Sequence, residues 1–467
     1  MLKKQIPEKQ FLIEKKIFSD LLAPLFDELN SEMNDEYCVI GNYDDLPNYT
    51  ENDVDIWVAN EKKFLKILKK VCILNKYRIY LLNFGYSGFN VYIVKTGFEL
   101  CTPVHLDIMT SVNLTPFYKI IDSKTIRSSI ERFRGFNILS KNVELFGHFM
   151  YPLINKGFVK QKYKSELTNL SGNRAFVALL ESSLGCKQAS LIAHRISKGD
   201  WDEIDLMSSD IKKKLFISTL LKDSYRIPVG IMKMIIRMLR RLVYPSGIFV
   251  VFLGVDGSGK TTTINSLDGF FNNYFLPGKC KKFYWRPFLL PRISKLLGNK
   301  YVPKSEKYNS DGTRVVKKNL PRRVLDVCKL IYYVIDFFIG RIKYQSEYSR
   351  GGIIVFDRYF YDNIIYAQRF GFYAPQFLMK LLNYLIPKPD LIFYLSSNPD
   401  VLYERKKEIN VDQIIEQQSK YDDFLFNFDN VVYVDTSDAP AATHDSIVKS
   451  CVLYMTDRLG GKFDFFR

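Results

Sequence analysis

The sequence predicts an α/β protein, and three features carry that prediction. A Gly-rich loop at residues 254–261 directly follows an apolar run, and four more strand-like runs alternate with helix-like sequence behind it. An earlier group of short apolar runs contains three aspartates. The C-terminal half therefore predicts a five-stranded parallel sheet with helices on both faces. The N-terminal half predicts an α+β domain with a helical extension.

The N-terminal half begins with a helical pattern at residues 17–32 and has a Lys-rich one at 61–76. Short β-like runs lie around the second helix, at 37–41, 54–59, 78–84, 90–95 and 104–109. From about 143 to 243 the apolar residues recur with mainly helical spacing, until "YPSG" breaks the pattern. These patterns predict three parts: a domain over 1–160, a helical extension over 161–245 and a C-terminal domain over 246–467.

The composition is that of a globular protein with excess positive charge. The chain has 467 residues, 47% of them hydrophobic, and a formal net charge of +17. This charge fits a nucleic acid, an anionic membrane or polyphosphate substrates as partners, or a surface on which lysine is simply common. The seven cysteines are scattered singly, which argues against disulfides and zinc, and the N-terminus shows no signal pattern. We expect a soluble, cytoplasmic protein.

The helical extension ends in the basic amphipathic segment 230–244, "GIMKMIIRMLRRLVY". A helix of this kind can lie on anionic lipid as a peripheral membrane contact. The alternative is an interdomain helix whose charged stripe faces solvent. The sequence leaves both interpretations open.

The loop "GVDGSGKTT" fits the phosphate-binding pattern G-x-x-x-x-G-K-T. Its backbone N–H groups and the start of the next helix would surround a phosphate, whereas a ligand-free Gly-rich turn is the alternative. We expect Lys260, as an exposed loop charge, to reach the β- and γ-phosphates of ATP, and Thr261 to hold Mg²⁺. The expected cofactor-binding residues of this loop are Gly254, Asp256, Gly257, Ser258, Gly259, Lys260, Thr261 and Thr262.

Polar residues follow the strand-like runs of the C-terminal half. Arg286 comes just after one run, the triplet Asp357, Arg358 and Tyr359 ends another, and the triplet Asp435, Thr436 and Ser437 ends the last. Because ligands bind at the carboxyl ends of parallel strands, we expect these residues at one binding edge.

In order and over 248–456, the motifs "FLGVDGSGKTT", "IIVFDRYFYD", "PKPDLIFYL", "ERKKE" and "YVDTS" resemble thymidylate kinase and its nucleoside monophosphate kinase-like relatives. The resemblance implies that Asp357 lies near Mg²⁺ and the acceptor, and that Arg358 holds the acceptor's phosphate. It implies that Arg405 and Lys406 lie on a closing lid, where Arg405 serves catalysis. It also places residues 435–437 beside the adenine.

The sequence departs from that family where the acceptor would bind. The family's Arg-Glu-Pro-Gly-Gly stretch is replaced by "YWRPFLLPR", which keeps Arg286 and Pro287, and a polar insertion follows at 298–323. We expect Arg286 and Tyr359 to join Arg358 in binding a small phosphorylated acceptor. The acceptor pocket is remodelled, so its substrate is left open among nucleotides, sugar phosphates and other phosphorylated metabolites.

Three aspartates in the N-terminal half form a candidate metal site. Asp53 and Asp55 are two apart on a strand and point to one face, and Asp107 comes from another strand-like run. Such a cluster suits two Mg²⁺ ions that hold a triphosphate while a hydroxyl attacks its α-phosphorus. Solvent-exposed acids on an edge strand are the alternative.

Over roughly 20–160 this arrangement resembles the polymerase-beta-like nucleotidyltransferases, whose paired acids follow a Gly-Ser or Gly-Gly about a dozen residues earlier. Here Gly41 and Asn42 hold that position, with Asn42 in place of the usual Ser or Gly. The resemblance implies that Asp53, Asp55 and Asp107 are catalytic metal ligands and that Gly41 and Asn42 contact the triphosphate.

Two functions follow as hypotheses. The first is a bifunctional enzyme, an ATP-dependent kinase fused to a nucleotidyltransferase-like domain. The second is an ATP-controlled nucleic-acid-binding or regulatory module with an inactive front domain. The first is favoured, because the acids and the lid arginine are present and no aromatic-basic motif for single strands stands out. The sequence leaves the oligomeric state open.

Overall fold

A computed structural model of the protein describes residues 8–50, 53–95, 103–111, 117–118, 120–267, 269, 271, 280–291, 320–366, 375–407, 410–437 and 440–463. The chain divides into two compact units. The first contains residues 1–240 and 458–467, and the second contains residues 241–457. No helix in the described ranges is long and apolar enough to cross a membrane.

The first unit is built on a mixed seven-stranded sheet in the order β3-β4-β5-β2-β1-β7-β6. Its strands are β1 (Tyr37–Val39), β2 (Val54–Val58), β3 (Tyr77–Phe84), β4 (Gly88–Lys95), β5 (Val104–Met109), β6 (Ile130–Phe133) and β7 (Phe136–Leu139). Strands β2 and β5 pair in parallel, with Asp55 opposite Asp107. The expected α+β architecture of this half is confirmed.

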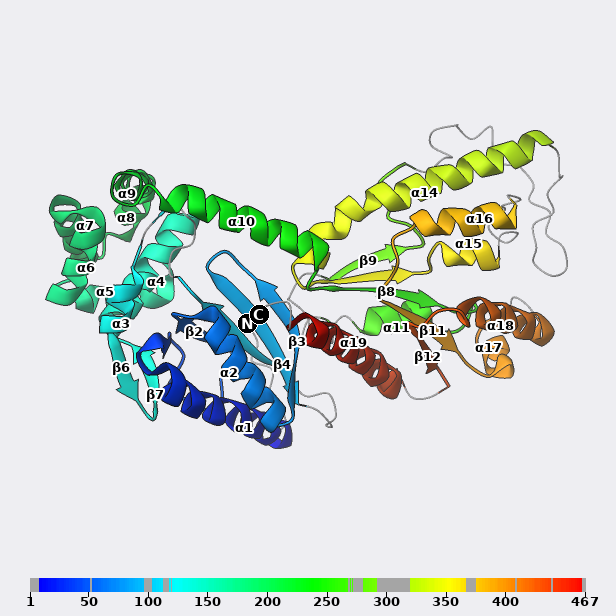
Figure 1. Ribbon diagram of the computed structural model, residues 1–467, viewed down its shortest axis with the longest axis horizontal. Helices are drawn as coiled ribbons and strands as arrows, with labels where there is room; N and C mark the ends of the chain where they lie inside the picture. Colours follow the sequence, from blue (N-terminus) through cyan, green and yellow to red (C-terminus); the bar gives the residue numbers. More distant parts are fainter. Residues whose placement is uncertain are drawn as a thin grey trace. The chain divides into compact units, whose positions relative to one another are not determined.

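Helices cover both faces of that sheet (Figure 1). One face packs on α1 (Glu8–Met33) and α2 (Glu61–Leu74). Because side chains alternate along a strand, Cys38 and Trp57 point to the opposite face, where they join a second core with the later helices. The elements of that layer are α3 (Ser123–Ser128), α4 (Lys141–Lys156), η2 (Gln161–Tyr163), α5 (Lys164–Leu170), α6 (Arg174–Leu184), α7 (Cys186–Lys198), α8 (Trp201–Leu206) and α9 (Ser208–Lys222).

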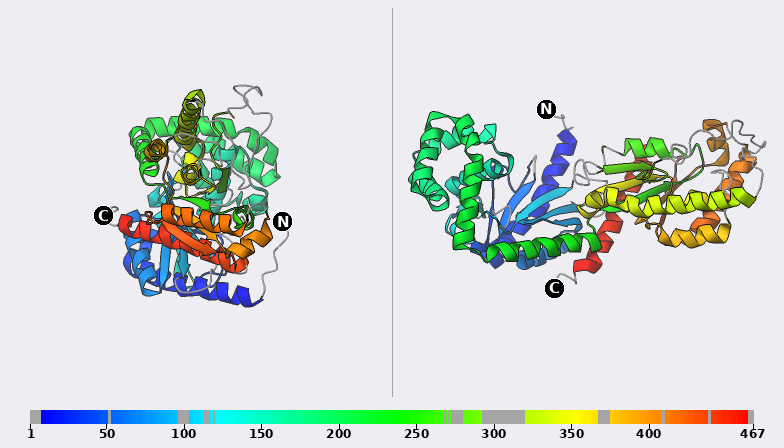
Figure 2. Two further views of the ribbon diagram at one scale, coloured as in Figure 1. Left: turned by 90° about the vertical axis from the view of Figure 1, so that its right-hand side faces the viewer. Right: turned by 90° about the horizontal axis from the view of Figure 1, so that it is seen from above.

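Figure 2 shows α6 to α9 gathered into a bundle beside the sheet. The helix α10 (Arg226–Val243) follows α9. The predicted helical spacing over 143–243 is thus realised as a series of helices. The short 3₁₀ helix η1 (Asn34–Glu36) joins α1 to β1.

The second unit contains the predicted five-stranded sheet, and every strand pair in it is parallel. Its order is β12-β11-β8-β10-β9, formed by β8 (Ile248–Leu253), β9 (Cys280–Tyr284), β10 (Ile353–Asp357), β11 (Leu391–Ser396) and β12 (Val431–Asp435). All six residues of β8 are buried, as expected of a central strand covered on both faces. The α/β fold class predicted from the sequence is confirmed.

Helices lie on both faces of this sheet (Figure 1). They are α11 (Lys260–Ser266), α14 (Leu320–Ser349), α15 (Tyr361–Ile365), α16 (Gln376–Leu382), α17 (Pro399–Arg405), α18 (Val411–Leu425) and α19 (Pro440–Phe463), with the 3₁₀ helix η4 (Asn383–Leu385) after α16. The inserted segment lies outside the described residues except for 320–323, which begin α14. The strands on either side of β8 belong to later parts of the chain, so the loop after β8 lies at a switch point of the topology, where ligands of such sheets bind.

Candidate functional site

The predicted phosphate loop runs from the buried end of β8 to the first turn of α11, and its glycines have a structural reason. Gly254, Gly257 and Gly259 have φ values of 144°, 88° and 81°, a region that other residues rarely enter. A Cβ at Gly254 would also lie 2.3 Å from the carbonyl oxygen of Leu395. The loop conformation therefore requires glycine at these three positions. The same is true of tight loops that bind a phosphate through their backbone.

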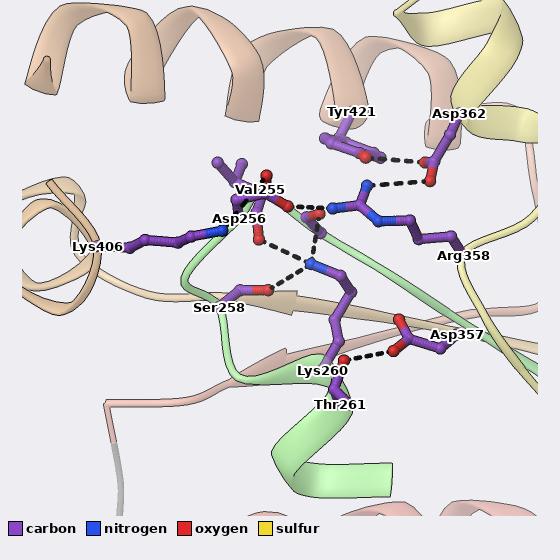
Figure 3. Close-up of polar contacts among 11 residues, drawn as sticks. Val255, Asp256, Ser258, Lys260, Thr261, Asp357, Arg358, Asp362, Lys406 and Tyr421 are labelled. Carbon is purple, nitrogen blue, oxygen red and sulfur yellow. Dashed lines mark hydrogen bonds and ion pairs between the residues drawn. The ribbon is translucent and has the colours of Figure 1, made fainter. Parts of the chain in front are cut away.

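Lys260 lies inside the loop, and the expectation of an exposed charge was wrong. The residue is only 5% exposed. Its Nζ donates to the carbonyl oxygens of Gly254 at 2.9 Å and Val255 at 2.8 Å, because the loop curls around the side chain (Figure 3). The pKa of Lys260 is lowered to about 8, mainly because the side chain is buried and secondly because the positive charge of Arg358 is nearby. An incoming phosphate would stabilise the charged form of this lysine.

Thr261 and Asp357 meet where a cation is expected. The Thr261 hydroxyl donates to Oδ2 of Asp357 at the end of β10. The second carboxylate oxygen, Oδ1, is buried without a hydrogen-bond partner among the described residues. A hydroxyl and a carboxylate with an unsatisfied oxygen are the hard oxygen ligands that suit Mg²⁺, which usually completes its shell with phosphate oxygens and water. These two residues therefore fit the predicted metal.

Arg358 follows Asp357 in a strained backbone conformation. Its φ of 72° lies in the left-handed region, which costs about 1–3 kcal/mol for a residue other than glycine. The guanidinium forms ion pairs with Asp256 of the loop and, at 3.3 Å, with Asp362, which also accepts from the Tyr421 hydroxyl (Figure 3). Burial opposes the charge, but the two carboxylates more than offset that effect and raise the pKa of Arg358. The strand end thus holds a fixed positive charge beside the loop.

A cavity of about 800 Å³ lies over the phosphate loop. Its lining includes nine residues predicted from the sequence: Asp256, Gly257, Gly259, Lys260, Thr261, Thr262, Asp357, Arg358 and Thr436. Both predicted lid residues, Arg405 and Lys406, also line it. A pocket of this size is typical of a small-molecule site. The fold therefore brings the loop and the "DRY" strand end together.

The sequence reasoning missed several residues of the cavity. They are Thr263, Ser266, Tyr284, Thr443 and His444. The Nε2 of His444 lies 2.6 Å from the Ser266 hydroxyl, which joins α19 to the end of α11. No motif marks this pair, because its members are 178 residues apart. Helical spacing would only have placed Ser266 near the face of Thr262 and Thr263.

The Arg405 guanidinium is engaged at the carboxyl end of β12. It donates to the carbonyl oxygen of Thr436 at 2.8 Å and to the Thr436 hydroxyl at 3.3 Å. The neighbouring Lys406 instead lies 4.0 Å from the Asp256 carboxylate of the phosphate loop. Asp435 and Ser437 stabilise the turn itself, since the Asp435 carboxylate accepts from the Ser437 N–H, which lowers the Asp435 pKa.

Two expected substrate-binding residues lie outside the cavity lining. Tyr359 is fully buried, and its hydroxyl donates to the carbonyl oxygen of Pro387. Arg286 is 2% exposed and pairs with the buried Asp336 of α14 at 2.9 Å. The Asp336 carboxylate also accepts from the backbone N–H groups of Phe288 and Leu290. This arrangement stabilises the loop after β9, a long-range pairing that the local motif did not reveal.

The first unit contains the second predicted site. Ligand oxygens of Asp53, Asp55 and Asp107 lie within 4.8 Å of one another. The parallel pairing of β2 with β5 brings Asp55 opposite Asp107. Burial, and secondly the neighbouring carboxylates, raise the pKa of Asp55 to about 8. Burial, and secondly the negative charge of Asp53, raise the pKa of Asp107 to about 6. Such crowding of acids is relieved by a divalent cation, and the oxygen donors suit Mg²⁺.

Other polar groups lie near these acids. Lys160 and Lys162 counteract the rise in the pKa of Asp55, so positive charge from η2 and the residue before it reaches the cluster. Gly41 and Asn42 have φ values of 67° and 50°, and Asn tolerates this left-handed region better than most residues. A Cβ on Gly41 would meet the side chains of Glu144 and His148 at 3.6 Å. The expected triphosphate turn thus abuts α4.

A family comparison bears on the second unit only. The thymidylate kinase family model matches residues 333–447, which include β10, β11 and β12. No curated protein matches the sequence. Among solved structures, thymidylate kinase from Ehrlichia chaffeensis is similar at 17% identity, covering 44% of this chain and 98% of that one, with a TM-score of 0.30. Thymidylate kinase from Candida albicans is similar at 16% identity, covering 44% of this chain and 90% of that one, with a TM-score of 0.31.

The family match supports part of the resemblance found in the motifs over 248–456. It covers the "DRY" strand end, the Arg405–Lys406 segment and the turn at 435–437. The second unit therefore contains a thymidylate kinase-like domain, and the class of activity it supports is a phosphotransferase. The nucleotidyltransferase-like character of the first unit rests on its residues alone.

Proposed function

We propose that the second unit is an ATP-dependent kinase that transfers the γ-phosphoryl group to a small phosphorylated acceptor. The observation that carries the proposal is the convergence of Lys260, the Thr261–Asp357 pair and Arg358 on one cavity. Phosphoryl transfer requires positioning and positive charge more than covalent participation by the protein. These four residues provide both.

Each residue has a role that follows from its surroundings. The loop N–H groups and Lys260 bind the donor phosphates, and Lys260 is already oriented by two loop carbonyls. Thr261 and Asp357 would hold Mg²⁺, which neutralises phosphate charge when bound. Arg358 is held in place by Asp256 and Asp362 and would bind the phosphate of the acceptor. Because these ion pairs are already formed, the side chain of Arg358 needs little rearrangement during transfer.

The acceptor class is tested by ADP release from ATP and Mg²⁺ in the presence of separate panels of nucleoside monophosphates, sugar phosphates and unphosphorylated analogues. We expect one phosphorylated class to stimulate ADP release and to gain a phosphate by mass. The Lys260→Met variant keeps much of the buried side-chain volume and should abolish the stimulation. Stimulation by unphosphorylated analogues alone would contradict the role given to Arg358.

We further propose that the first unit is a nucleotidyltransferase-like domain that uses the Asp53, Asp55 and Asp107 cluster. The support is the approach of three carboxylates to within 4.8 Å, with Lys160 and Lys162 near enough to affect Asp55. Such acids bind Mg²⁺ and align a hydroxyl with an α-phosphorus, and the lysines add charge for a triphosphate. Pyrophosphate release from each of the four nucleoside triphosphates tests this proposal. Release that persists in Asp55→Asn would refute it.

A further inference from the structure

The helix α10 exposes an apolar face to solvent. Side chains along the middle of this face are 38–58% exposed, a high value for large apolar residues in consecutive turns. They are Ile231, Met232, Ile235, Ile236, Met238, Leu239 and Leu242. Extended exposed apolar surfaces usually mark a contact with another molecule. The only residue of α10 that is buried is Gly230.

The opposite, basic side of α10 is the side that contacts the first unit. Arg237 donates to the backbone carbonyl of Tyr86 at 2.6 Å and lies 3.5 Å from the Glu61 carboxylate. The Arg240 guanidinium lies 5.7 Å from the centre of the Phe84 ring. Gly230, which lies on the same helical face as Arg237, is buried. Of the two interpretations of this segment, the one with a charged stripe facing solvent does not hold for Arg237 and Arg240, which contact the first unit while the apolar side is exposed.

Exposed apolar residues also occur directly before α10 in the chain. Ile217, Leu220 and Leu221 near the end of α9, and Tyr225 in the turn before α10, are 47–78% exposed. Helix α9 leads directly into α10 (Figure 1). We refer to these exposed residues, together with the α10 residues above, as the α9–α10 apolar surface. Its α10 part runs from Ile231 to Leu242, about 18 Å of helix.

Charge indicates what covers this surface. No Asp or Glu occurs between residues 224 and 255. Lys222 at the end of α9 and Lys233 in α10 are exposed, whereas Arg237 is paired with Glu61 of the first unit. A second copy of the chain would bring the same excess of positive charge against itself without acids to pair with it. An anionic bilayer offers both an apolar interior for the exposed side chains and negative headgroups for the exposed lysines.

We propose that α10 and the end of α9 dock the protein on the surface of an anionic lipid bilayer. The apolar side chains enter the boundary between headgroups and acyl chains, and the helix lies parallel to the membrane plane. Lys233, exposed on α10, and the lysines of α9 provide charge at the rim of the contact. This inference is independent of either proposed activity, because it uses no residue of the two sites.

The test is co-sedimentation of the full-length chain with vesicles of phosphatidylcholine, with and without phosphatidylglycerol. We expect binding to the anionic vesicles and weaker binding to the neutral ones or at high salt. The double variant Ile235→Glu, Leu239→Glu places two charges at the centre of the apolar face and should weaken binding by about ten-fold or more. ADP formation without lipid should stay unchanged.

A matched control introduces the same charges on another exposed apolar pair of the first unit. Ile73 and Leu74 at the end of α2 are 66% and 68% exposed, so Ile73→Glu, Leu74→Glu should leave vesicle binding intact. Equal loss in both variants, or no binding by the parental chain, would overturn the proposal. It would also be overturned if the α10 variant dissociates an oligomer in sedimentation without lipid, since a second copy would then cover the surface.

An optical readout distinguishes insertion from electrostatic adsorption. The parental chain has three tryptophans, whose emission is the background. Beyond that background, Leu239→Trp should show a blue shift on addition of anionic vesicles, whereas Ile73→Trp should not. Binding without a shift at Leu239 would mean that the apolar face stays in water, which contradicts the proposed orientation.

Discussion

The side-chain hydroxyl of Thr261 donates a hydrogen bond to the carboxylate of Asp357, and this contact joins the first turn of α11 to the end of β10. The two residues are 96 positions apart. Parallel pairing of β8 with β10 makes their approach possible, because both strands end at the same edge. The phosphate loop and the "DRY" motif therefore form one site.

The Asp357 carboxylate is expected to be required for transfer and much less for nucleotide binding. Asp357→Asn keeps the shape and the contact to Thr261 but removes the charge. We predict a fall in kcat of about 10²–10³, as for the loss of other groups that stabilise charge in a transition state. Steady-state kinetics against Mg²⁺ concentration provide the measurement, and Thr261→Ser, which keeps the hydroxyl, is the control. An unchanged kcat would reduce the pair to a structural contact.

Lys260 combines a structural and a functional role, which two substitutions separate. Lys260→Ala removes the side chain around which the loop is curled, so it should lower both thermal stability and turnover. Lys260→Met fills most of the same space and should retain the melting temperature while still abolishing turnover. The comparison is made by thermal unfolding and ADP release. Turnover in the methionine variant would show that the charge of Lys260 is dispensable.

Arg405 was expected from the sequence to act on the moving phosphoryl group, but in the structure it binds Thr436. We predict that Arg405→Ala raises the KM for ATP several-fold and changes kcat less, because it loosens the cavity wall at β12. Lys406→Ala, beside Asp256 of the loop, is the adjacent comparison. A fall in kcat at constant KM would instead assign Arg405 to the transition state and require it to leave Thr436.

The acidic cluster predicts an unusual pH dependence of stability in the first unit. Unfolded Asp55 has a pKa near its ordinary value of 3.8, whereas burial and nearby acids raise it to about 8 in the fold. Between these values the folded state holds a proton that the unfolded state has lost, so stability falls as pH rises. Mg²⁺ binds the deprotonated carboxylates and should restore more stability at pH 8 than at pH 6.

Thermal unfolding at pH 6 and pH 8, with and without Mg²⁺, measures this effect. Asp55→Asn, which cannot ionise, should flatten the pH dependence and weaken the response to Mg²⁺. Asp20→Asn serves as the control, since Asp20 lies outside the cluster and pairs with Lys95. An equal Mg²⁺ response in the parental chain and in Asp55→Asn would contradict metal binding at this site.

Local patterns were sufficient to predict the parallel sheet and the phosphate loop, because alternation and glycine spacing directly reflect backbone geometry. The meeting of Asp53, Asp55 and Asp107 also followed from strand periodicity. The pairing of Arg286 with Asp336, the burial of Tyr359 and the His444–Ser266 contact depend on which distant elements pack together. The sequence left the direction of the apolar face of α10 open for the same reason, since periodicity defines a face but not its direction.

The central claim is that the second unit moves the γ-phosphoryl group of ATP. ATP labelled separately at the α- and γ-phosphates, offered with Mg²⁺ and the phosphorylated acceptors, tests it most directly. We predict that the γ-label reaches an acceptor, that Lys260→Met and Asp357→Asn abolish this transfer, and that Asp55→Asn leaves it intact. Transfer of the γ-label that survives Lys260→Met and Asp357→Asn, or ATP binding without movement of either label, would contradict the claim.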